Sequence, residues 1–196
     1  MSARIRPMTG ADVPAVLAIE RAVFTTPWSA ESFLAEVAQP ESREWVVAES
    51  GAGVEGYAGL MFVGDEAHVM NLAVDERARH AGLGVALVAH LLDAAAARGA
   101  RRVTLEVRAS NAAAIGLYRL AGLSSVGVRP GYYADVGEDA SIMWTEDLDG
   151  ELMRERRAAL RERAERALEL FRPPVHAAPD PIADAPDTDL ILAIET

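Results

Sequence analysis

Two hydrophobic periodicities divide most of the chain into helices and strands. Apolar residues recur every third or fourth position over residues 13–23 and 82–98, a spacing that predicts helices with one buried face. Over residues 102–108, apolar and polar side chains alternate, which predicts a strand with one buried face. The other expected elements are helices at residues 29–37 and 111–121 and strands at residues 3–8, 45–49, 57–63, 67–74, 126–129 and 141–145. This order predicts one mixed α/β domain, residues 1–149, with about seven mostly antiparallel strands and about four helices.

The C-terminal part of the chain has a different composition. Residues 150–172 are rich in Glu, Arg, Ala and Leu, and their apolar residues recur at helical spacing. This stripe comprises Met153, Leu160, Ala164, Leu168 and Phe171. We therefore expect a solvated amphipathic helix, and the sequence does not decide whether it docks on the domain. Residues 173–196 contain many Pro, Ala and Asp residues, a composition that predicts a flexible acidic linker or tail.

The charge of the chain narrows the choice of partners. The formal net charge is −11 at pH 7, and all 19 basic residues are arginines. Binding to nucleic acid needs a basic surface that neutralises phosphates, so the composition argues against nucleic acid as the primary partner. It is compatible with a cationic substrate, such as an amine or a basic polypeptide. The alternative is that the acidity serves only solubility.

Disulfides, metals and membrane spans are not expected. The chain has no cysteine, which excludes disulfides and thiolate metal sites. No two of its four histidines stand at metal-ligand spacing; they are His68, His80, His90 and His176. The N-terminal residues lack the apolar run of a signal peptide, and no apolar stretch reaches the roughly 18 residues of a membrane span. We expect a cytoplasmic protein without a metal.

Residues 71–85 form the first segment with candidate chemistry. They predict the end of a strand, a short loop and the start of a helix, with Arg79, Gly82 and Gly84 in the loop. The first amides of a helix lack internal partners, and the helix dipole favours an anion beside them. Glycines also let a ligand approach the backbone closely. The segment thus favours a pyrophosphate site; the alternative is that its glycines serve only tight packing.

A second glycine pattern resembles a nucleotide-binding motif but lacks the context that such a motif needs. Gly51-Ala-Gly53-Val-Glu-Gly56 matches the dinucleotide-binding fingerprint. A strand follows it instead of a helix, so a pyrophosphate would find no helix N-terminus there. We expect a hairpin turn.

Glu106 and Tyr118 are the candidates for proton transfer. Glu106 lies on the strand face opposite the apolar residues, where a half-buried carboxylate can act as a general base. Tyr118 lies in the helix that Asn111 is expected to cap, and its hydroxyl can donate a proton. Each residue has an alternative interpretation. Glu106 would pair with an arginine such as Arg108, and Tyr118 would pack in the core.

Several further segments together are specific to one family. The segments of the first half are Pro27-Trp28-Ser29 with Phe33, Asn71-Leu-Ala-Val74 and Arg79-x-x-Gly82-x-Gly84. The segments of the second half are Leu105-Glu-Val-Arg-Ala-Ser-Asn111, Leu117-Tyr118, Gly122-Leu123, Arg129-x-x-Tyr132-Tyr133 and Glu138-Asp-Ala140. Over residues 3–147 the chain resembles the RimI-type ribosomal-protein-alanine N-acetyltransferases of the GNAT superfamily. Val85 departs from the pattern, because these enzymes often have an arginine there.

The resemblance implies a fold, a cofactor and roles for residues. It implies the GNAT fold, in which acetyl-CoA lies where the central fourth and fifth strands splay apart. It implies Glu106 as the general base and Tyr118 as the general acid. The implied cofactor-binding residues are Leu72, Ala73, Val74, Arg79, His80, Ala81, Gly82, Leu83, Gly84, Val85, Asn111 and Tyr118. The implied substrate-binding residues are Trp28, Arg129, Tyr132 and Tyr133. The implied acceptor is the N-terminal amine, at alanine, of a small-subunit ribosomal protein.

Two other functions stay open at this point. A GNAT enzyme that acetylates a small-molecule amine would keep the cofactor residues but need a closed acceptor pocket. A non-enzymatic module would act as a tethered partner of a tRNA-modification enzyme. Residues 189–196 resemble the opening strand of the tRNA threonylcarbamoyladenosine transferase, which implies a partner or a fused domain of that kind.

Overall fold

A computed structural model describes residues 2–173, so the expected tail, His176 and the residues 189–196 lie outside the described part. The strands are β1 (Arg4–Pro7), β2 (Arg43–Ser50), β3 (Gly53–Val63), β4 (Glu66–Val74), β5 (Arg102–Arg108), β6 (Leu123–Tyr133) and β7 (Glu138–Thr145). The helices are α1 (Val13–Val23), α2 (Ala30–Val37), α3 (Leu83–Ala97), α4 (Ala112–Leu120) and α5 (Glu151–Leu170), with short 3-10 turns η1 (Gly10–Asp12) and η2 (Glu76–Ala78). The expectation of a mixed α/β fold with seven strands is confirmed.

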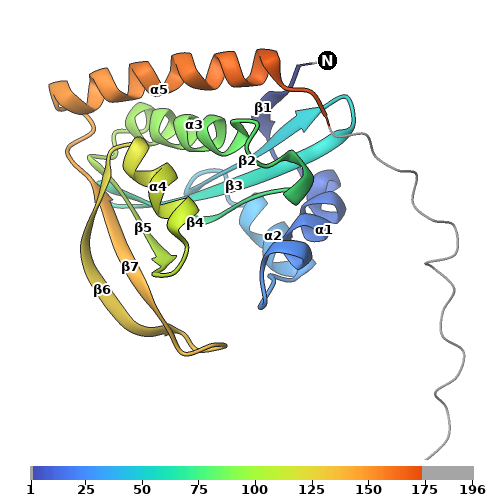
Figure 1. The fold of residues 1–196 in the computed structure, drawn as a ribbon, viewed down its shortest axis with the longest axis horizontal. Helices are drawn as coiled ribbons and strands as arrows, with labels where there is room; N and C mark the ends of the chain where they lie inside the picture. The colour runs from blue at the N-terminus through green and yellow to red at the C-terminus, as the bar shows by residue number, and fades with distance from the viewer. Residues whose placement is uncertain (1, 174–196) are drawn as a thin grey trace, which may run out of the picture.

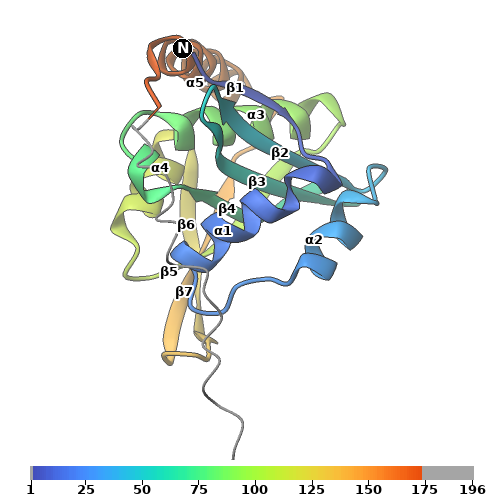
Figure 2. The ribbon, with the colours of Figure 1, turned by 90° about the vertical axis from the view of Figure 1, so that its right-hand side faces the viewer.

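The strands form one sheet in the order β1-β2-β3-β4-β5-β7-β6. All neighbouring pairs are antiparallel except β4 and β5, which are parallel. Helices cover both faces: α3 packs on one face and α1 and α2 on the other (Figure 1; Figure 2). Among residues 2–173 no helix has the length and apolarity needed to cross a membrane.

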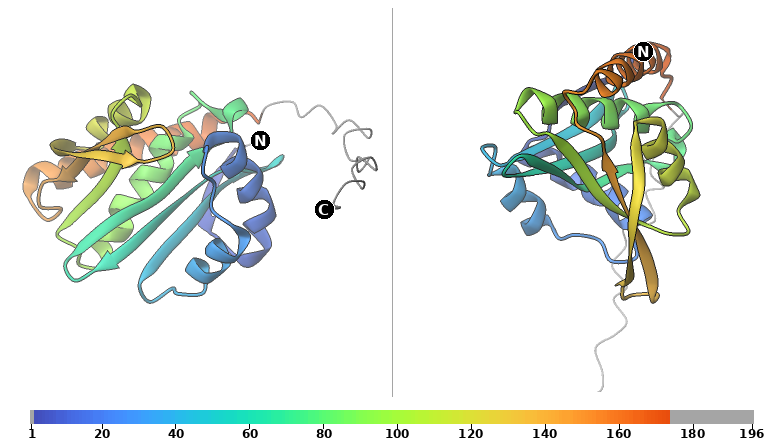
Figure 3. Two further views of the ribbon diagram at one scale, coloured as in Figure 1. Left: turned by 90° about the horizontal axis from the view of Figure 1, so that it is seen from below. Right: turned by 90° about the vertical axis from the view of Figure 1, so that its left-hand side faces the viewer.

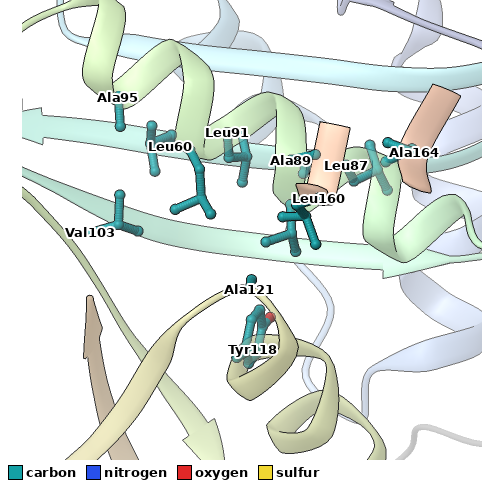
Figure 4. Close-up of a cluster of buried hydrophobic side chains, with 14 of the residues drawn as sticks. Leu60, Leu87, Ala89, Leu91, Ala95, Val103, Tyr118, Ala121, Leu160 and Ala164 are labelled. Carbon is teal, nitrogen blue, oxygen red and sulfur yellow. The ribbon is translucent and has the colours of Figure 1, made fainter. Parts of the chain in front are cut away.

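Helix α3 is apolar on nearly all sides because it is buried on two of them. Leu87 and Leu91 are almost fully buried in the core cluster that also holds Leu60 of β3 and Val103 of β5 (Figure 4). Helix α5 packs on α3 on the side away from the sheet and forms an additional outer layer (Figure 1). A helix between two apolar partners needs no broad polar face.

Helix α5 is docked on the domain through its apolar stripe, a point that the sequence leaves open. Met153, Leu160, Ala164 and Phe171 of its predicted stripe are buried in the same cluster as α3. Its outward residues are mostly Glu and Arg and remain exposed. The division at residue 150 stays a prediction.

The glycine pattern at residues 51–56 forms the hairpin turn that the sequence predicts, but the turn is shorter than those six residues. Ser50 pairs with Gly53, so β3 begins within the glycine pattern. The β6–β7 hairpin is longer than predicted, and it extends beyond the rest of the sheet (Figure 3). Its outer strand β6 is an edge strand with mostly exposed side chains, so it lacks the apolar alternation that marks a half-buried strand.

The centre of the sheet opens between β4 and β5. They pair only through Glu66↔Arg102, Ala67↔Val103 and His68↔Thr104. Beyond these pairs β4 stays with β3 and β5 stays with β7, so the two strands part. The register between β3 and β4 shifts at Gly59 and Leu60, which leaves Met70 as an extra residue in β4 beside the gap. The predicted splaying of the central strands is confirmed.

Candidate functional site

A cavity of about 350 Å³ lies where β4 and β5 part. Strand β4 lines it with residues 68–72, and β5 lines it with residues 105–108. The other lining residues are Glu20, Phe24, Thr26, Trp28, Asn111, Ala114, Leu117, Tyr118, Tyr132 and Tyr133. The cavity therefore collects side chains from α1, the α1–α2 segment, α4 and β6 around the two parted strands.

Glu106 points into this cavity and is held by two basic side chains. One carboxylate oxygen, Oε2, lies 3.0 Å from Nε2 of His68, the last β4 residue paired with β5. The other, Oε1, accepts a hydrogen bond of 3.2 Å from Nη1 of Arg129. The side chain of Glu106 is 14% exposed and lines the cavity. A carboxylate in this position can accept a proton from a bound amine.

Glu106 does pair with an arginine, as the alternative interpretation suggested, but the partner is Arg129 and not Arg108. Arg108 instead donates to Asp135 at 2.8 Å and to Glu138 at 3.3 Å, and its guanidinium lies 4.1 Å from the ring centroid of Tyr133. Arg108 pairs in register with the beginning of β7, so its side chain reaches the β6–β7 hairpin. It forms part of an ion network at the rim of the cavity.

Tyr118 belongs both to the core and to the cavity. Its side chain is 7% exposed and packs in the main cluster near Ala121 (Figure 4). Burial, with a smaller contribution from Tyr133, raises the pKa of Tyr118 to about 12. The phenol therefore keeps its proton at neutral pH, and within residues 2–173 no hydrogen bond engages its hydroxyl.

The N-terminus of α3 fits an anionic group. Gly82 precedes the helix with φ of 86°, a backbone conformation that favours glycine. The first intrahelical bond runs from the amide of Ala86 to the carbonyl of Gly82 at 3.1 Å. The amides of Leu83, Gly84 and Val85 precede that bond, and no side chain caps this helix start. Three adjacent N–H groups at the positive end of a helix can bind a phosphate.

The loop before α3 adds positive charge beside these amides. Arg79 is 42% exposed, and within residues 2–173 its guanidinium makes only a 3.7 Å ion pair with exposed Glu76, so it is available to a ligand. His80 has φ of 62°, a left-handed conformation in a residue that is not glycine. Strained backbone of this kind often occurs in ligand-binding loops. The loop therefore suits the pyrophosphate of a nucleotide cofactor.

Aromatic residues border the other end of the cavity. The Trp28 ring lies 5.4 Å from that of Phe33 and 5.7 Å from that of Trp45, centroid to centroid. Tyr132 and Tyr133 contact each other edge to face, with centroids 5.1 Å apart. Trp28 comes from the α1–α2 segment and the two tyrosines from β6, so the two groups reach the cavity from different elements.

The structure places seven of the seventeen predicted site residues at the cavity. Leu72, Asn111, Trp28 and both tyrosines of β6 line it beside the two proton-transfer candidates. The other β4 residues, the loop from Arg79 to Val85 and Arg129 do not line it. Asn111 also caps α4, since its Oδ1 accepts from the amide of Ala114 at 3.0 Å. Among residues 2–173 no group of three or more His, Asp or Glu side chains is placed to hold a metal ion.

His68 and Glu20 also lie at the site, although the sequence did not single them out. His68 could not be found, because the sequence does not give the register between β4 and β5. Glu20 could have been found: it follows Val13, Val16 and Leu17 at helical spacing and thus falls on the buried face of α1. A carboxylate at a core position is uncommon and indicates a special environment.

Comparison with known proteins points to one family. Residues 13–123 match the family model described as the acetyltransferase (GNAT) family. The ribosomal protein bS18-alanine N-acetyltransferase of Escherichia coli is 39% identical over 134 residues, which cover 67% of this chain and 89% of that protein. The N-alpha-acetyltransferase RimI of Mycobacterium tuberculosis is 38% identical over 142 residues, covering 69% and 87%. The crystal structure of the Escherichia coli enzyme superposes with a TM-score of 0.68 at 37% identity, covering 76% of this chain and 97% of that one.

Proposed function

Since the chain belongs to the GNAT family of acetyltransferases, we propose that it acetylates the N-terminal α-amine of a protein, with alanine of ribosomal protein bS18 as its acceptor. Relatives in two bacterial species carry names for N-terminal acetylation, and the Escherichia coli relative is named for this acceptor. The observation that carries the proposal is the parting of β4 from β5 beside Glu106 and Tyr118. Ribosomal proteins are made in the cytoplasm, which we take as the place of the reaction.

Members of this family use acetyl-CoA, and the residues present fit that donor. We assign the pyrophosphate to the free amides of Leu83, Gly84 and Val85, with Arg79 beside them. We assign the pantetheine and acetyl portion to the gap beside Leu72, Ala73 and Val74 of β4. Acetyl-CoA, when bound there, supplies the acetyl group as an activated thioester.

Glu106 and Tyr118 would move the protons. A free α-amine has a pKa of about 7.7–8.0, so much of it is still protonated at neutral pH. Glu106 would accept that proton at a carboxylate oxygen, directly or through water, and leave a neutral nucleophile. Tyr118 would donate its phenolic proton to the leaving sulfur, because its raised pKa keeps it protonated. The neutral amine would attack the thioester carbonyl without a covalent enzyme intermediate, and the carbon–sulfur bond would break after the carbon–nitrogen bond forms. The second proton of the nitrogen would return to the Tyr118 phenolate, which restores the acid.

His68 and Arg129 would orient the base. The two contacts fix both oxygens of Glu106 and direct the carboxylate along the cavity. Arg129 is 57% exposed, so it can move away when an acceptor arrives, whereas His68 is held on β4. We therefore assign His68 to positioning Glu106 and Arg129, with Trp28, Tyr132 and Tyr133, to the acceptor side.

Mass spectrometry tests the proposal. The full chain would be incubated with acetyl-CoA and, separately, a peptide with N-terminal alanine, the same peptide blocked at its α-amine, and a panel of small amines. We expect a gain of one acetyl group on the free peptide only. Acetylation of the small amines with no reaction of the peptide would contradict the proposal and favour a small-molecule acetyltransferase.

A further inference from the structure

Glu20 is a buried carboxylate that the proposed reaction does not use. Glu20 lies on α1 among apolar neighbours, and its exposed fraction is 1%. It also lines the cavity. Burial raises the pKa of Glu20, and hydrogen bonds from Trp28 and Asn71 act against that rise. A buried carboxylate destabilises a fold unless it is well paired, and an apolar residue of similar size is often more stable at such a position. A role at the cavity would explain why the carboxylate is there.

The partners of Glu20 come from three different elements, and each of them donates. The backbone N–H of Trp28 donates to Oε1 at 3.0 Å. The side-chain amide of Asn71, on β4, lies 3.2 Å from both carboxylate oxygens. The hydroxyl of Tyr57, on β3, donates to Oε2. In this arrangement the two oxygens of the ionised carboxylate accept from all three partners, whereas the amide of a glutamine would offer only one acceptor oxygen.

These contacts connect the acceptor end of the cleft to the strand that borders the donor site. Trp28 lines the cavity, and its ring is already held by the rings of Phe33 and Trp45. The backbone of the α1–α2 segment has no regular secondary structure around Trp28, so its hydrogen bond to Glu20 fixes where that segment lies. Asn71 sits next to Met70, the extra residue of β4 beside the gap. Glu20 therefore spans from β4 to the acceptor wall.

We propose that Glu20 is a positioning residue that holds the Trp28 segment against β4 and so sets the width of the acceptor site. The inference rests on the proposed function, because it concerns the same acceptor. A fixed wall beside the first residue of the acceptor favours small N-terminal residues, and a loosened wall admits larger ones. Glu20 thus controls acceptor affinity and selectivity, not proton transfer.

Glu20→Gln tests this inference by steady-state kinetics on the full chain. We expect KM for an alanine-initiated peptide to rise about tenfold while KM for acetyl-CoA changes less than about twofold. The preference for that peptide over a leucine-initiated one should fall by a similar factor. Glu55→Gln is the matched control, because Glu55 is also 1% exposed but bonds Ser50 and does not line the cavity. It should leave both KM values and the preference unchanged.

A second readout does not depend on activity. The protein has three tryptophans, and a freed Trp28 segment should make their fluorescence easier to quench with acrylamide in Glu20→Gln than in Glu55→Gln. Asn71→Ala removes one of the donors to Glu20. It should raise the KM for the alanine-initiated peptide by about a third as much as Glu20→Gln does, again with little change in the KM for acetyl-CoA. The inference fails if both KM values of Glu20→Gln rise together, if neither moves, or if Glu55→Gln matches it. If the wild-type chain acetylates no peptide, the proposed function fails, and quenching alone still decides the link between Glu20 and Trp28.

Discussion

Glu106 presents its carboxylate to the cavity between β4 and β5, and its side chain is 14% exposed. Its neighbours on the strand, Leu105 and Val107, are buried on the opposite face. The two basic partners, His68 and Arg129, hold its oxygens without covering the cavity side. The geometry suits a base that is oriented before the acceptor binds.

Replacing Glu106 with glutamine should remove the base and keep the shape of the site. We expect the rate of peptide acetylation to fall by about 10²–10⁴-fold, the usual range for loss of a general base. Affinity for acetyl-CoA, measured by isothermal titration calorimetry, should stay within about twofold because the carboxylate faces the acceptor. A normal turnover number in this variant would rule out Glu106 as the base.

The raised pKa of Tyr118 predicts a broad alkaline range of activity. A tyrosine with an ordinary pKa of about 10 would be half ionised at pH 10, and only the protonated half could act as an acid. Because the pKa of Tyr118 is about 12, its protonated form persists through that range. We expect kcat to show no alkaline decline up to about pH 10, and Tyr118→Phe to lower kcat at every pH. An alkaline limb below pH 9 that disappears in Tyr118→Phe would contradict this.

The sequence was informative about single side chains only where local pattern decides their orientation. The alternation of β5 was enough to place Glu106 on the face opposite the core. The partners of Glu106 were not predictable, because His68 and Arg129 lie on other strands, β4 and β6. Which residues of different strands lie side by side depends on the strand register, and the register is set only in the folded sheet. The same limit explains the wrong pairing with Arg108.

At the scale of elements, α5 braces the start of α3. A Cβ atom on Gly82 would lie 2.5 Å from the Cβ of Ala167, so α5 presses directly against the residue that precedes the free amides. The amide of Ala3 also donates to the carbonyl of Leu168 at 2.9 Å, which fixes this end of α5. Arg161 pairs with Asp93 of α3 at 2.8 Å. The C-terminal helix therefore supports the loop assigned to the pyrophosphate.

Enlarging Ala167 should disturb that loop selectively. Ala167→Leu would push on Gly82, whose position has no room for added atoms, and we expect acetyl-CoA affinity to fall about tenfold. Acceptor KM at saturating acetyl-CoA should change little, because the acceptor site lies away from α5. Ala158→Leu on the same helix, at an exposed position, is the control. Equal effects of the two substitutions on calorimetric affinity would argue against the brace.

Helix boundaries were well predicted because capping is local chemistry. Ser29 accepts from the amide of Ser32 at 3.2 Å, and Asn111 caps α4, as their residue types suggest. The docking of α5 was not predictable, since its charged composition fits a free helix equally well. The one sign of this docking in the sequence is that α3, the helix against which α5 packs, is apolar on nearly all sides.

Across the whole molecule, an ion network joins the N-terminal elements to the edge of the sheet. Arg6 of β1 donates to Asp12 at 2.7 Å and to Glu49 of β2 at 2.8 Å. The hydrogen bond from Arg6 to Asp12 is the main reason that the pKa of Asp12 lies well below its usual range. The hydrogen bond from Arg6 to Glu49 contributes most to lowering the pKa of Glu49 to about 2. These carboxylates stabilise the fold when ionised.

Acid should therefore weaken the fold in a defined window. A carboxylate whose pKa is lowered by folding contributes stability above its unfolded pKa of about 3.9, and that stability is lost as pH falls toward the folded value. We expect Asp12→Asn to lower the free energy of unfolding at pH 7 by about 1–3 kcal/mol and to flatten its decline between about pH 4 and 2. Urea unfolding at several pH values measures this, with exposed Glu41→Gln as the control. A decline in Asp12→Asn as steep as that of the wild type would contradict the assignment.

A crystal structure of the full chain grown with acetyl-CoA tests the central claim most directly. We predict electron density for the pantetheine arm between residues 69–74 of β4 and residues 105–108 of β5, the pyrophosphate on the first amides of α3, and the thioester facing Glu106 and Tyr118. Density for the cofactor at any other place, or β4 and β5 paired along their full length, would contradict the account.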